Sequence, residues 1–166
     1  MFNKKKSITT LLVIPFIGFA QQPIDTIAMQ KVLDEVNVNA LRATEKTPVA
    51  FTNISKSEIE KGNLGQDLPY IISLTPSVVT TSDAGAGVGY TGFRVRGSDP
   101  TRINVTVNGI PLNDSESQGV WWVNMPDFTS SVDNIQIQRG VGTSTNGASA
   151  FGASVNLKTT GLNKDA

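Results

Sequence analysis

Short strands separated by tight turns dominate the second half of this 166-residue chain and constrain its fold more than any other feature. Residues 103–107 alternate between apolar and polar side chains. The pair Asn108-Gly109 that follows favours the positive φ angles of a two-residue type I′ hairpin turn. Further short strands are predicted at 93–96, 132–139 and 153–159. Two of them end on an arginine-glycine pair.

Helix signals are confined to the first half of the chain. A predicted strand at 48–54 leads into Ser55, which forms a capping-box pattern with Glu58 three residues later. A second short helix is predicted over 66–74, where Leu68, Ile71 and Ile72 follow helical spacing. Two short helices and five or six short strands predict an α+β domain built on a small mixed β-sheet.

The N-terminus has the order of a secretory signal. Three lysines precede an apolar run that ends near the small residue Ala20, after which cleavage is expected. A membrane anchor is the alternative, but the run is shorter than the roughly 20 residues that span a bilayer. Pro15 also interrupts it. We therefore expect residues 1–20 to be a cleaved signal peptide.

Composition excludes several functions. The chain has no cysteine and no histidine, so disulfides, zinc-type sites and histidine acid–base chemistry have no residues to build them. The 14 basic and 14 acidic residues leave no positive surplus for nucleic acid. The string Gly87 to Gly92 fits a dinucleotide motif, but a strand follows it where that motif needs a helix. We therefore expect that the protein is not an enzyme and has neither a cofactor nor a metal site.

Residues 21–47 are polar and predicted to be a flexible segment. Within them, Val36 and Val38 alternate with asparagines, which suggests a short strand that is not stable alone. Such a strand becomes ordered by adding to the sheet edge of another protein. A disordered leader is the open alternative.

Loop and strand-end side chains leave further alternatives open. Loop carboxylates such as Asp83, Asp114 and Glu116 are expected mainly as solvated turn residues. Arg96 and Arg139 are either solvated edge charges or partners of carboxylates across an interface. For the adjacent tryptophans at 121 and 122, either one packs inward while the other faces out, or both cover the core.

Several of these segments, in the same order, resemble the plug domain of TonB-dependent outer-membrane transporters. The resemblance covers residues 36–159 and rests on the segments 48–51, 67–78, 94–97, 107–113 and 135–140. Asparagine at 146 and alanine at 153 depart from the tyrosine and glycine that the family commonly has there. The fold implied is a small mixed sheet with two short helices and long apical loops.

The resemblance implies roles for particular residues. The TonB box, which pairs as a strand with the periplasmic domain of the TonB protein, falls on Asp34, Glu35, Val36, Asn37 and Val38. Arg96 and Arg139 fall on positions that latch the plug to glutamates of the surrounding β-barrel. The loops at 82–90 and 112–122 face the ligand, with Asp83, Tyr90, Asp114, Glu116, Trp121 and Trp122 as candidate contacts.

The implied organisation is a signal peptide at 1–20, a flexible segment at 21–47, a plug at 48–160 and the start of a barrel region at 161–166. A transmembrane strand needs about 9–11 residues, more than the last segment has. The predicted function is the gate of an outer-membrane transporter that imports a scarce nutrient, most commonly an iron–siderophore complex. The alternative is a free-standing periplasmic module that binds a ligand or protein.

Overall fold

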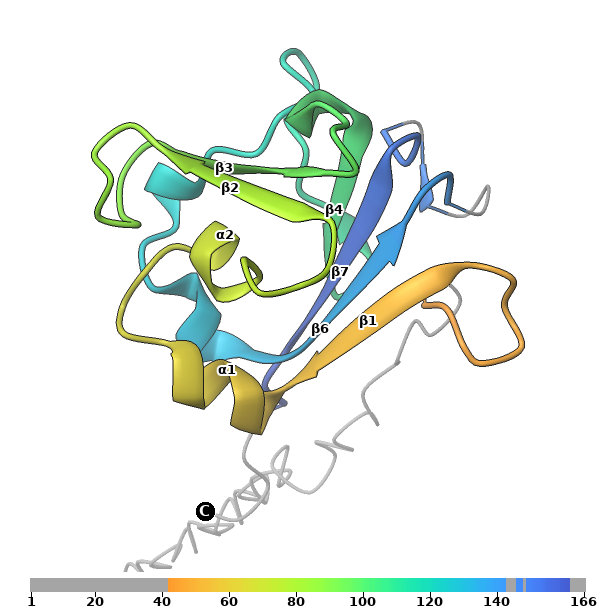
Figure 1. Ribbon diagram of the computed structural model, residues 1–166, viewed down its shortest axis with the longest axis horizontal. Helices are drawn as coiled ribbons and strands as arrows, with labels where there is room; N and C mark the ends of the chain where they lie inside the picture. Colours follow the sequence, from red (N-terminus) through yellow and green to blue (C-terminus); the bar gives the residue numbers. More distant parts are fainter. Residues whose placement is uncertain (1–41, 143–145, 148, 162–166) are drawn as a thin grey trace, which may run out of the picture. The chain divides into compact units, whose positions relative to one another are not determined.

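In a computed structural model, the described residues are 42–142, 146–147 and 149–161. They contain a five-stranded sheet with the order β1-β6-β7-β4-β5 (Figure 1). Only the β4–β7 pair is parallel, so the sheet is mixed, as predicted. The strand bounds are β1 Ala50–Ser55, β4 Ile103–Val107, β5 Ile110–Pro111, β6 Val132–Arg139 and β7 Ala153–Thr159. The predicted signal peptide, the box-like residues 34–38 and residues 162–166 lie outside the described residues.

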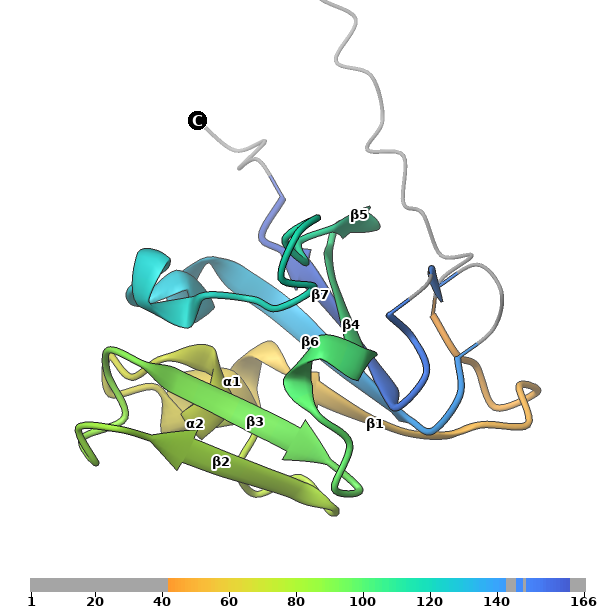
Figure 2. The same ribbon diagram turned by 90° about the horizontal axis from the view of Figure 1, so that it is seen from above.

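Two short helices and a β-hairpin lie on one side of this sheet (Figure 2). They are α1 (Lys56–Gly62), α2 (Leu68–Ile71), β2 (Val78–Ser82) and β3 (Thr91–Val95). Three 3-10 turns complete the fold: η3 (Pro100–Arg102), η4 (Trp122–Asn124) and η5 (Phe128–Ser131). Among the described helices, none combines the length and the apolar character needed to cross a membrane.

The two helices differ in how well the sequence predicted them. The capping box of α1 is confirmed, since the backbone N–H of Ser55 donates to the Glu58 carboxylate at 2.8 Å. The helix α2 is shorter than the predicted 66–74. The Ser73 hydroxyl donates to the carbonyl of Tyr70 at 2.6 Å, and a turn closed by Thr75 follows. A hydroxyl that competes for backbone carbonyls in this way favours an early helix end.

The core lies between the apolar face of the sheet and this second layer. Its sheet side includes Val105, Ile135, Ile137, Val155 and Leu157, all at most 2% exposed. The opposing side chains come from both helices and the hairpin, and include Ile59, Leu68, Ile72 and Phe93. Successive residues on a strand point to opposite faces, so the polar residues between these apolar ones lie on the other face of the sheet.

That other face is also buried, which alternation alone does not predict. We call it the polar layer, and its members are Asn104, Thr106, Gln136, Gln138, Ser154 and Asn156, none more than 4% exposed. Hydrogen bonds join its strands: the hydroxyl of Thr106 donates to the Asn156 side chain at 2.7 Å. The Gln138 amide donates to Gln136 at 3.0 Å. Several of these buried polar groups therefore satisfy one another, whereas Asn104 Nδ2 and Ser154 Oγ have no hydrogen-bond partner among the described residues.

The segment Arg42–Ala43 lies on the polar layer. The Ala43 backbone N–H donates to Gln136 Oε1 at 2.7 Å, and Gln136 Nε2 donates to the Ala43 carbonyl at 2.9 Å. The Arg42 guanidinium donates to the side chain of Asn134 and to the Asn156 carbonyl. One glutamine amide thus pairs with both backbone groups of Ala43, as a neighbouring strand would. Both residues lie within the segment 21–47, which the sequence predicts to be flexible.

Candidate functional site

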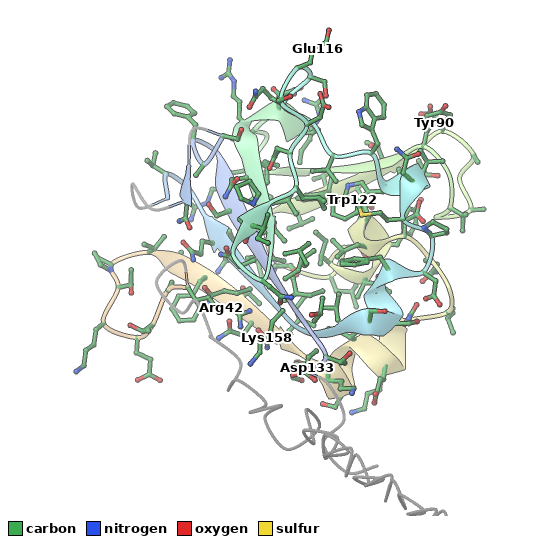
Figure 3. The ribbon with its side chains drawn as sticks, turned by 180° about the vertical axis from the view of Figure 1, so that it is seen from behind. Arg42, Tyr90, Glu116, Trp122, Asp133 and Lys158 are labelled. Atoms are coloured by element: carbon green, nitrogen blue, oxygen red, sulfur yellow. The ribbon has the colours of Figure 1, made fainter. Side chains whose placement is uncertain are left out.

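A cavity of about 510 Å³ lies between the β2–β3 hairpin and residues 117–123. Four of the six predicted ligand-facing residues line it: Asp83, Tyr90, Trp121 and Trp122. The other two, Asp114 and Glu116, belong to the loop 112–122 with both tryptophans but do not line the cavity. Figure 3 shows Tyr90 and Glu116 at one end of the domain, and Arg42, Asp133 and Lys158 at the other.

The two tryptophans face opposite ways, which decides between the alternatives left open by the sequence. Trp122 is 3% exposed, and its ring lies 6.1 Å from that of Phe93. Trp121 is 54% exposed. Trp122 therefore forms the floor of the cavity as part of the core, while Trp121 offers an accessible aromatic face at its rim.

The loop between β2 and β3 is fastened to α2. A Cβ placed on Gly87 would approach the Tyr70 ring to 3.1 Å, and Gly87 has a φ of +78°, so a side chain here would both crowd the ring and strain the backbone. The backbone N–H of Asp67 donates to the Gly87 carbonyl at 2.9 Å. The Thr91 hydroxyl donates to the buried carboxylate of Asp67 at 2.7 Å. These contacts position Asp83 and Tyr90.

The second loop is fastened to β4 by Asn113, a residue that sequence reasoning did not single out. The Val105 N–H donates to Asn113 Oδ1 at 2.8 Å, and Asn113 Nδ2 donates to the carbonyl of Ile103 at 2.9 Å. The side-chain amide thereby imitates a strand beyond the two-residue β5. No sequence signal distinguishes it from other loop asparagines.

Asp114 closes a turn at the tip of this loop. Its Oδ1 accepts hydrogen bonds from the N–H of Ser117 at 2.7 Å and from the N–H of Glu116 at 3.0 Å. The hydrogen bonds from the backbone and hydroxyl of Ser117 lower the pKa of Asp114 because they favour the carboxylate. Asp114 therefore acts as the turn residue that its loop position predicts.

The two arginine-glycine pairs meet at one margin of the fold. Arg96 adopts a left-handed φ of 51°, and its Nη1 lies 3.2 Å from where a Cβ of Gly140 would stand. Arg139 Nη1 donates to the Pro76 carbonyl at 3.4 Å, while its buried Nε has no partner among the described residues. The ion pairs of the described region join Lys56 to Asp133 and Arg94 to Asp99, and include neither Arg96 nor Arg139.

Within the described part of the chain, no group of three or more acidic, histidine or cysteine side chains lies close enough together to bind a metal ion.

The family model of the TonB-dependent receptor plug domain matches residues 43–154. The chain belongs to this family. Its members are outer-membrane receptors, which are transporters and not enzymes. No curated protein matches the chain in sequence.

Solved structures support the plug fold. The siderophore receptor PirA from Acinetobacter baumannii is 21% identical with a TM-score of 0.54, over 68% of this chain and 17% of that one. A mutant of the ferric enterobactin receptor PfeA from Pseudomonas aeruginosa is 24% identical with a TM-score of 0.55, over 74% of this chain and 19% of that receptor. This plug chain thus spans less than a fifth of either receptor. The predicted family and α+β plug fold are confirmed.

Proposed function

We propose that this plug is the gate of an outer-membrane transporter that imports a scarce nutrient, of the iron–siderophore type. The observation that carries the proposal is that the two predicted apical loops, 82–90 and 112–122, meet at one cavity. An accessible aromatic rim above an aromatic floor is typical of ligand sites. The similar structures include receptors named for siderophores and for ferric enterobactin, which supports the same substrate type.

The arginine margin supports a barrel as the partner of the plug. Arg96 directly follows β3 and Arg139 ends β6, and neither forms an ion pair within the described residues. A guanidinium pairs with a carboxylate through two parallel hydrogen bonds, which suits a fixed but separable contact. Glutamates on the inner wall of a barrel are the partners we propose for both arginines.

The TonB box is the proposed site of energy input. Residues 34–38 lie only a few positions before Arg42, so a pull on the box reaches the Ala43–Gln136 hydrogen bonds early. We expect the signal peptide at 1–20 to direct export, and the box to face the periplasm. Strand addition would then supply binding through backbone hydrogen bonds.

The test is calorimetric titration of the chain with the periplasmic domain of the TonB protein. Val36→Pro removes an N–H from the middle of the box and restricts its backbone, so we expect the affinity to fall about tenfold or more. Ala28→Pro, in the same segment but outside the box, is the matched control and keeps the affinity. Equal affinity for the Val36→Pro chain would overturn strand addition at this segment.

A further inference from the structure

The charges around the cavity indicate which class of chelate it accepts, an inference that rests on the proposed transport function. We infer that the cavity takes an uncharged or cationic metal chelate with apolar surface, such as a trihydroxamate complex. A multiply charged anion such as a tris-catecholate complex is disfavoured. The argument comes from the balance of charge and from the aromatic surface at the rim.

The lining has more acidic than basic groups. Its charged residues are Asp83, Arg94 and Asp99. Arg94 Nη2 lies 3.7 Å from the Asp99 carboxylate, so the cation of the lining already has an anionic partner. Asp83 has no cation within 4.0 Å among the described residues. Within the lining, an incoming anion therefore meets an uncompensated carboxylate and no unpaired cation.

The two loops above the cavity contribute further negative charge. Residues 82–90 and 112–122 together contain the carboxylates Asp83, Asp114 and Glu116, and no lysine or arginine. The nearby cation Arg102 lies over the Phe151 ring, 6.0 Å from its centre, and does not line the cavity. Charges of one sign around a cleft repel ligands of that sign and attract the opposite one.

Aromatic surface provides the complementary attraction. Tyr90 is 63% exposed and Trp121 is 54% exposed, and both line the cavity above the buried Trp122. Exposed aromatic faces bind apolar ligand surface and also attract cations through the ring quadrupole. Next to the Asp83 carboxylate, this combination suits a ligand that is neutral or positively charged and partly apolar.

Simple charge balance separates the common chelate classes. A trivalent metal bound by three hydroxamate monoanions is neutral, and a free ammonium group on the chelator makes the complex cationic. The same metal bound by three catecholate dianions carries three negative charges. Both classes surround the metal with six oxygens, but they differ in charge and in the aromatic rings of the catecholates. The effect of Asp83→Asn on their relative affinity therefore isolates the charge argument.

The experiment titrates the full chain with gallium(III) chelates, which do not quench tryptophan emission as iron does. The probes are a linear trihydroxamate with a free ammonium group and a tris-catecholate, followed by calorimetry and tryptophan fluorescence. We expect the trihydroxamate to bind about tenfold more tightly or better. Asp83→Asn should reduce the ratio of the two affinities, and Trp121→Ala should weaken trihydroxamate binding. The control Asp133→Asn, at the other end of the domain, should change neither (Figure 3).

Tighter binding of the tris-catecholate would overturn the chelate class and leave the transport proposal intact. Binding of neither chelate, or a ratio that Asp83→Asn does not alter, would also overturn the inference. The transport proposal has its own test in the TonB titration, which uses no chelate. The two failures are therefore distinguishable.

Discussion

Replacing Gln136 with methionine tests how the segment that leads from the predicted TonB box is fastened to the sheet. Gln136 makes four side-chain hydrogen bonds: two with the Ala43 backbone, one to Asn53 Oδ1 at 2.8 Å and one from Gln138 at 3.0 Å. Methionine keeps a similar volume and removes all four. Gln136 is 3% exposed and Ala43 is 5% exposed, so neither group is well hydrated in the folded chain.

The expected loss follows from these contacts. A hydrogen bond contributes about 1 kcal/mol net, and a buried group left without a partner costs about 1–3 kcal/mol. Part of this cost disappears because the Ala43 backbone regains water if its segment detaches. We therefore expect the free energy of unfolding to fall by about 2–3 kcal/mol in Gln136→Met.

Urea unfolding followed by tryptophan fluorescence measures this change. With a slope of about 1–3 kcal/mol per molar urea, the midpoint should fall by roughly 0.7–3 M. Hydrogen exchange at the Ala43 amide should also become faster. Gln118→Met is the control, because Gln118 is exposed and its two side-chain hydrogen bonds, with Ser115 and Ser149, lie at the surface where water can replace them. If both variants changed stability by less than about 0.5 kcal/mol, Gln136 would not fasten this segment.

Three further results are expected. Gly152→Ala should lower stability by about 1–3 kcal/mol in urea unfolding, because its methyl would overlap Ser98 and approach the Arg102 carbonyl to 3.1 Å; an unchanged midpoint would contradict the packing. Trp122→Ala should cost about 3–5 kcal/mol by the same assay, whereas exposed Trp121→Ala should cost little; similar losses would contradict their opposite orientations. The lowered pKa of Asp114 contributes stability that is present above its unfolded value of about 3.9 and is lost as pH falls through the folded value. Acid unfolding of Asp114→Asn should therefore show a weaker pH dependence than that of the unchanged chain, and identical curves would refute the turn's role.

Local sequence signals predicted much of this fold. Asn108 and Gly109 have the positive φ values, 51° and 86°, that their turn requires, and they join β4 to β5. The capping box and the strands of the second half were equally readable, because each depends on neighbouring residues. The length of α2 could not be predicted in this way, because the Ser73 hydroxyl competes for the Tyr70 carbonyl, which would otherwise continue the helix.

The polar layer shows where sequence patterns stop being informative. Alternation in 103–107, 132–139 and 153–159 indicates that one face of each strand is apolar. It says nothing of whether the polar face meets water or other polar groups. Burial of Gln136 and Asn156 depends on the distant segment at Arg42 and on pairing between strands, which no local pattern encodes.

The sequence predicted which loops form the candidate site, but it did not predict which residues hold those loops in place. The glycine-rich segment and the paired tryptophans marked two loops, and the structure brings both to one cavity. Asn113 and Asp67, which fix those loops, carry no distinctive spacing because their partners are far along the chain or are backbone groups. A polar layer can exchange its hydrogen bonds with water, which suits the gate function that we propose.

Hydrogen exchange of residues 34–38, with and without the periplasmic domain of the TonB protein, shows whether this segment adds as a strand to that protein. An added edge strand directs alternate N–H groups to its partner, so alternate amides within these residues should become protected. The amide of Val36 or those of its two neighbours should slow, and Val36→Pro should abolish the pattern. Protection that fails to appear at 34–38, or that appears only elsewhere in the chain, would contradict the account.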